Sequence, residues 1–225
     1  MSRTPLALRR LPNYTAAQEA ANTVTHIIGG AIGILVLICG VLLCAFRRDR
    51  WDLVGMCIYG SSMIALYTVS SVYHGLKPGM AKKVMQVLDH CTIYFLIAGT
   101  YTPILIGGLR PTHPVLCWVL FGIQWGLTAF GVTFTAIDHN RFQKLSMVCY
   151  LCMGWTLVLA LPAVLQSLGK EFFAWILAGG VLYTLGAVLY MIGAKKPVFH
   201  TVFHIFTVIG SLLQAIGILF YMGTF

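Results

Sequence analysis

Residues 22–46 read NTVTHIIGGAIGILVLICGVLLCAF, a continuous apolar stretch without a single Asp, Glu, Lys or Arg. About 20 apolar residues in an α-helix suffice to cross the hydrocarbon core of a bilayer. The strands of a membrane barrel instead alternate apolar and polar residues over about 10 positions. This stretch therefore predicts a transmembrane α-helix.

The rest of the sequence has the same character. Hydrophobic residues make up 59% of the chain and charged residues only 9%, whereas a soluble domain carries about 25% charged residues. Short gaps containing charge, Pro or Gly separate the apolar runs. These runs lie at 52–75, 87–107, 114–136, 145–166, 172–193 and 199–222. We therefore expect an all-α membrane protein, a seven-transmembrane helix bundle.

The basic residues give this bundle a direction. The net charge is +9, but the cations lie in the short gaps, which favours membrane orientation over a nucleic-acid partner. Ten would lie on one side and five on the other, so the N-terminus should be cytoplasmic and the C-terminus outside. The ten are Arg3, Arg9, Arg10, Lys77, Lys82, Lys83, Arg141, Lys144, Lys195 and Lys196, and the five are Arg47, Arg48, Arg50, Arg110 and Lys170. The expected domains are a cytoplasmic N-terminal segment, 1–21, and one membrane domain, 22–225.

Ionisable residues at membrane depth are costly and usually functional. The motif HTVFH places His200 and His204 four residues apart, on one face of a helix, although such a pair alone is often incidental. His74 ends a predicted span on the same side, and Asp89 begins another. Three more polar residues begin the first span at this level: Glu19, Asn22 and His26. They would either form hydrogen bonds between helices or support the histidines.

These residue types indicate a metal site. Three His nitrogens suit Zn²⁺ and leave a fourth position open, as catalytic zinc sites do. Asp89 could accept and return a proton of an activated water. Ser70, one turn before His74, could bond a developing oxyanion or simply its own helix backbone. His90 points about 100° away from Asp89, so we expect a packing role for it.

At these positions the sequence resembles the haemolysin III branch of the progestin and adipoQ receptor family, within the alkaline-ceramidase-like superfamily. The matching motifs are EAANTVTH (19–26), SSVYH (70–74), LDHCTIYFLIAGTYTP (88–103) and HTVFH (200–204). The resemblance covers essentially the whole chain. It implies a seven-span fold with Zn²⁺ held by His74, His200 and His204, and with Asp89 and Ser70 near the metal's water.

The function expected from this resemblance is zinc-dependent hydrolysis of a lipid amide, ceramide-like or a related acyl lipid, although an enzyme is not the only reading. A non-enzymatic membrane protein with a structural zinc site, acting as a lipid sensor or a cytolysin, is the alternative, and a transporter is a third. The expected partners are membrane lipids, with no nucleic acid and no obligate protein partner. The expected location is a bacterial cytoplasmic membrane.

Overall fold

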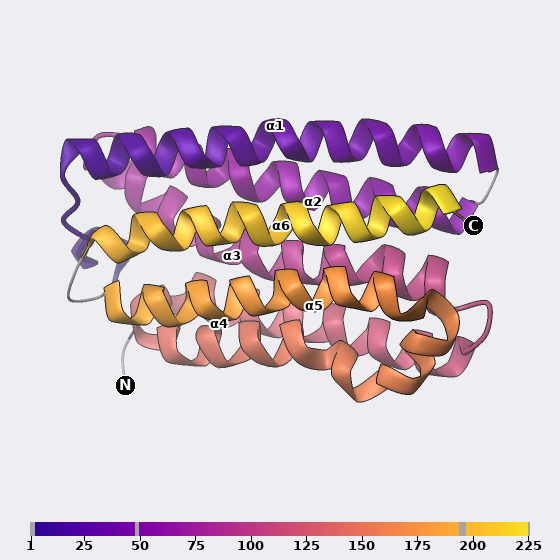
Figure 1. The fold of residues 1–225 in the computed structure, drawn as a ribbon. Helices are drawn as coiled ribbons and strands as arrows, with labels where there is room; N and C mark the ends of the chain where they lie inside the picture. Colours follow the sequence, from indigo (N-terminus) through magenta and orange to yellow (C-terminus); the bar gives the residue numbers. More distant parts are fainter. Residues whose placement is uncertain (1–2, 48–49, 194–196, 225) are drawn as a thin grey trace.

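The computed structural model describes residues 3–47, 50–193 and 197–224 of the chain. Long α-helices run along a common direction and form one bundle, with the two termini at opposite ends (Figure 1). The helices are α1 (Ala16–Arg47), α2 (Arg50–Gly75), α3 (Met80–Thr102), α4 (Pro114–Trp155), α5 (Leu161–Gly193) and α6 (Val198–Thr224). The described ranges contain no strand, which confirms the expected all-α class.

The bundle is apolar on its outside and carries polar groups within. Large apolar side chains such as Phe46 and Leu159 are 85% and 82% exposed. Conversely, Asn22, Lys82 and Asp89 are all less than 9% exposed. This arrangement suits a protein whose outer surface is solvated by lipid.

Helix α1 begins at Ala16, six residues before the predicted span, because a capping box fixes its start. The Gln18 backbone N–H donates to the Thr15 Oγ1 at 3.2 Å, and the Thr15 N–H donates to the Gln18 Oε1 at 2.9 Å. Two otherwise unpaired donors are thus satisfied. The additional turns of helix carry Glu19 into the bundle.

Helix α3 ends in a distortion at Pro103. A π-helical segment, η2 (Pro103–Leu109), directly follows α3, since proline cannot continue a regular helix. Gly55 of α2 lies against this point, where an added Cβ would come within 2.7 Å of the Pro103 Cα. The close approach of the two backbones therefore requires glycine.

Five helical stretches among the described residues are long and apolar enough to cross a membrane. One of them, Pro114–Ile192, has 79 residues, and as a straight helix it would measure roughly 120 Å. Its helical geometry breaks at Asp138 (φ −159°, ψ 90°) and at Gly169 (φ 84°, ψ 169°). Both breaks fall in gaps that the sequence predicts between spans. The count of seven spans itself stays a prediction.

Candidate metal centre

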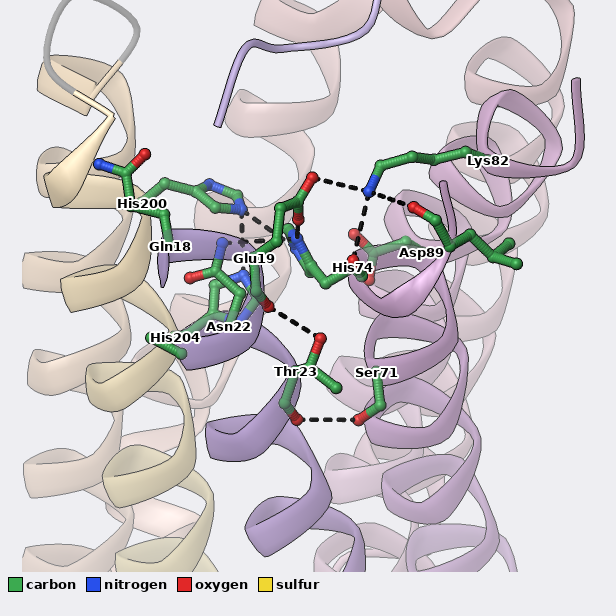
Figure 2. Close-up of polar contacts among 12 residues, drawn as sticks. Gln18, Glu19, Asn22, Thr23, Ser71, His74, Lys82, Asp89, His200 and His204 are labelled. Atoms are coloured by element: carbon green, nitrogen blue, oxygen red, sulfur yellow. Dashed lines mark hydrogen bonds and ion pairs between the residues drawn. The ribbon is translucent and has the colours of Figure 1, made fainter. Parts of the chain in front are cut away.

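Three histidines from two helices converge at one end of the bundle. His74 ends α2, and His200 and His204 occupy the first turns of α6. The His200 Nε2 lies 3.0 Å from the His204 Nε2 and 3.4 Å from the His74 Nε2. One ligand atom from each of the three lies within 4.8 Å of the others, and all three residues are buried. The structure thus brings together the three residues that we expected to hold a metal (Figure 2).

The outer nitrogen of His74 tests whether these rings fit a metal. The His74 Nδ1–H donates to the Glu19 Oε2 at 2.6 Å. A carboxylate at this position fixes the tautomer, so that the lone pair of Nε2 faces the centre, as is usual for metal-bound histidine. In a neutral imidazole, each ring nitrogen either donates one proton or accepts a hydrogen bond. Three Nε2 atoms that face one another therefore cannot all form hydrogen bonds among themselves, and a cation fits the space between them.

The predicted supporting residues lie against this centre from α1. Glu19, Asn22 and His26 follow spacings of three and four, which places them on one helical face. The Asn22 Nδ2 lies 3.4 Å from the His74 Nδ1. The His26 ring stacks on the His204 ring, with 3.8 Å between centroids. The structure therefore brings all three to the histidines, in contact with the rings.

Lys82 is a residue of this site that the sequence reasoning missed, because it was counted only as a loop cation. Its side chain is 3% exposed. The Nζ donates to the Glu19 Oε1 at 2.7 Å, to the Leu76 carbonyl at 2.9 Å and to the His74 carbonyl at 3.3 Å. All three ammonium protons are used, so Lys82 holds Glu19 in place beside His74 (Figure 2). Its spacing of seven residues before Asp89, on one helical face, was the available signal.

Tyr14, which precedes α1, was also missed. Its ring stacks on the His200 ring with centroids 4.9 Å apart and an interplanar angle of 20°. Burial raises the pKa of the Tyr14 phenol well above its ordinary value, so the ring covers the histidines as a neutral group. No periodic pattern marks this contact, because Tyr14 belongs to irregular chain that folds back over the bundle.

A cavity of about 130 Å³ lies beside the histidines. Ser70, Asp89, His26, His200 and His204 all contribute to its wall, and much of the remaining lining is apolar or aromatic. The Ser70 Oγ is buried and has no hydrogen-bond partner within the described ranges, so it does not bond its own helix backbone. Asp89 is 8% exposed. The cavity thus combines a polar end at the metal centre with an apolar interior.

The packing role that we expected for His90 describes only part of its contacts. Its ring packs against His139 with centroids 3.7 Å apart, which fits that role, but His90 also lines the cavity. Its Nδ1 donates to the Gln86 carbonyl at 2.8 Å, and its Nε2 lies 3.3 Å from the Tyr190 hydroxyl. His90 is therefore a neighbour of the metal centre with other partners of its own.

Comparison with known proteins gives consistent relatives. A family model described as "Haemolysin-III related" matches residues 14–215. The "Hemolysin-3 homolog" of Bacillus subtilis is 36% identical over 92% of this chain and 96% of its own length. The "Hemolysin-3" of Bacillus cereus is 36% identical over 91% and 92%, and the human "Monocyte to macrophage differentiation factor" is 28% identical over 92% and 86%. No solved structure shows a significant match.

Proposed function

Because the chain belongs to the haemolysin-III-related family of membrane proteins, we propose that it is a zinc-dependent integral membrane hydrolase. Its substrate class is a lipid amide or a related acyl lipid. The convergence of His74, His200 and His204 beside a largely apolar cavity carries this proposal. Polar ligands and an apolar cavity together suit a lipid whose reactive group meets a metal.

The proposed membrane arrangement has seven spans, with the N-terminus in the cytoplasm and the C-terminus outside. The breaks at Asp138 and Gly169 support this count, since they divide the longest stretch into pieces of transmembrane length. The termini at opposite ends of the bundle support an odd number of spans (Figure 1). The excess of basic residues supports the orientation, although Arg48, Lys195 and Lys196 lie outside the described residues. The proposed location is a bacterial cytoplasmic membrane.

Zinc is the proposed metal because imidazole nitrogen is one of its preferred ligands. Across the described part of the chain, the candidate ligand set has three members, all histidine. A structural zinc site is usually closed by four protein ligands, whereas a catalytic site keeps one position open. The three-membered set therefore favours the enzyme over the alternative of a structural staple in a sensor or cytolysin. Zinc, when bound, would supply a water activated for attack near neutral pH.

The cavity residues have separate roles in the proposed reaction. The Asp89 carboxylate takes the proton released as water adds to the carbonyl carbon, and returns it to the leaving nitrogen when the C–N bond breaks. The Ser70 hydroxyl, which has no hydrogen-bond partner among the described residues, donates to the carbonyl oxygen as charge develops there. The apolar lining holds the acyl chain, which would enter from the surrounding lipid.

Adjacent serines provide a sharp test with purified protein and a short-chain ceramide as substrate. Ser70 lines the cavity, whereas the Ser71 Oγ donates to the Tyr67 carbonyl at 2.7 Å. Ser70→Ala should lower kcat by about 10²-fold, and Ser71→Ala should leave it within a small factor of the parent. Asp89→Asn should lower kcat by about 10²–10⁴-fold with zinc content unchanged. Equal activity of the parent and Asp89→Asn would refute the proposed chemistry.

The same preparation tests the alternative function. The name of the Bacillus cereus relative, "Hemolysin-3", raises cytolysis as an activity. Vesicles loaded with a self-quenched dye would report it directly. If the parent protein shows no hydrolysis and dye leakage persists in Asp89→Asn, the result would favour a cytolytic function over an enzymatic one.

A further inference from the structure

The irregular chain between Thr4 and Thr15 folds back across the end of the bundle that holds the metal centre. It contains one short 3₁₀ turn, Leu6–Leu8, and otherwise no regular structure. Despite this, Arg9 within it is only 4% exposed. Burying a guanidinium is costly unless it is paired and hydrogen-bonded, so this segment is held by specific contacts.

Those contacts lie at the break in α4. The Arg9 Nη2 donates to the Ile137 carbonyl at 2.6 Å, and the Arg9 Nε lies 3.8 Å from the Asp138 Oδ1. From the same segment, the Thr4 N–H donates to the Asp138 Oδ2 at 3.0 Å. Asp138 has extended rather than helical geometry, which turns its carboxylate and the preceding carbonyl toward the segment. The break in α4 thus provides the acceptor groups that bind Arg9.

The other end of the segment lies over the histidines. The Tyr14 ring stacks on His200 and lies 5.8 Å from the His74 ring centroid. Between these two ends, the Lys83 Nζ of α3 donates to the Ala7 carbonyl. The segment is therefore fastened at Asp138, supported at Ala7 and closed over the metal centre at Tyr14.

We propose that residues 4–15 form a strap, latched by Arg9 on Asp138, that closes the end of the metal centre nearest to water. The closed strap slows exchange of the bound metal and directs the lipid substrate to enter from the side of the bundle. The part of this inference that concerns metal exchange rests on the proposed zinc site. Docking of the strap itself does not.

Two adjacent arginines allow a matched test. Arg9 is buried, whereas Arg10 is exposed, so replacing either with Ala removes the same charge but only one removes the latch. Amide hydrogen exchange over residues 4–15 should become about tenfold faster or more in Arg9→Ala and remain at the parent rate in Arg10→Ala. Asp138→Asn, which keeps the side-chain volume, should also accelerate exchange and serves if Arg9→Ala folds poorly.

The rate at which zinc passes to an excess of a chelating dye measures whether the strap slows release of the metal. Release should be about tenfold faster or more in Arg9→Ala than in Arg10→Ala, since the strap must open before the metal leaves. Equal amide hydrogen exchange in the two variants would overturn the proposed latch. Faster amide exchange in Arg9→Ala with an unchanged rate of zinc release would overturn the proposed barrier to metal exchange.

A further readout separates this inference from the proposed function. If the purified parent protein binds no zinc, the proposed hydrolase fails, and modification of His200 by diethyl pyrocarbonate then reports on the strap in the metal-free protein. His200 should react faster in Arg9→Ala than in Arg10→Ala, because Tyr14 no longer covers its ring. Equal rates would overturn the covering role of the strap.

Discussion

Two groups of histidines lie near the same end of the bundle, and they differ in what their nitrogens face. In the first, His74, His200 and His204 direct their Nε2 atoms toward one point. In the second, His90 and His139 lie even closer, with ring centroids 3.7 Å apart. The comparison teaches that the direction of the lone pairs, rather than the proximity of the rings, distinguishes a metal centre from a packed pair.

The partners of each group explain the difference. The outer nitrogen of His74 donates to Glu19, which leaves the inner nitrogen free to bind a cation. Both nitrogens of His90 face other partners, the Gln86 carbonyl and the Tyr190 hydroxyl. We therefore expect the first group to bind zinc and the second to stabilise the packing of α3 against α4 and α5.

The largest expected effect comes from removing one ring of each group. His204→Ala should abolish zinc binding, from about one ion per chain to nearly none, because two imidazoles cannot complete the site. His139→Ala should retain the zinc. Since His204 and His139 are 1% and 3% exposed, the two truncations create similar cavities, and metal analysis of the purified proteins isolates the ligand effect. Loss of zinc from both variants would break the distinction.

An intermediate effect is expected at Glu19. Glu19→Gln keeps the shape of the side chain but weakens its hold on His74, so zinc affinity should fall by about 10–100-fold. A competition titration against a chelating dye would measure this change. Glu171→Gln is the control, because Glu171 is exposed. An unaltered affinity in Glu19→Gln would mean that the carboxylate does not orient the ring.

The smallest effect is expected at Tyr190, which contacts both groups. Its hydroxyl accepts a hydrogen bond from the Gln143 Nε2 at 2.9 Å and lies near His90, while its ring lies 5.6 Å from the His200 ring. Tyr190→Phe should lower the free energy of unfolding by about 1 kcal/mol without changing zinc content. Thermal unfolding and metal analysis on one sample test both parts. A loss of zinc would show that the two groups act as one unit.

Much of the fold could be predicted from the sequence, because hydropathy is a local property. The stretch at 22–46 predicted a helix, because its apolar run is long enough to cross a bilayer. The start of α1 at Ala16 was missed, since the capping box of Thr15 and Gln18 lies in a polar segment that hydropathy does not score. Helix-end chemistry decided that boundary.

The candidate site was predicted where a pattern repeats and missed where contact depends on the folded chain. The spacing of His200 and His204 placed two rings on one face of a helix, and His74, which ends a predicted span on the same side of the membrane, supplied the third ring. Lys82 looked like an ordinary loop cation, because nothing local shows that its three protons find acceptors at α1 and α2. Tyr14 was missed for the same reason, since the path of irregular chain is set by distant contacts such as that between Arg9 and Asp138.

The position of Thr4 beside Asp138 has a practical consequence for producing the protein. A purification tag or fluorescent fusion joined ahead of Thr4 would begin within a few residues of a partly buried hydrogen bond and a buried ion pair. The C-terminus lies at the opposite end of the bundle (Figure 1). Tags for affinity capture, surface immobilisation or nanodisc tethering should therefore be placed after α6, where they leave the N-terminal contacts intact.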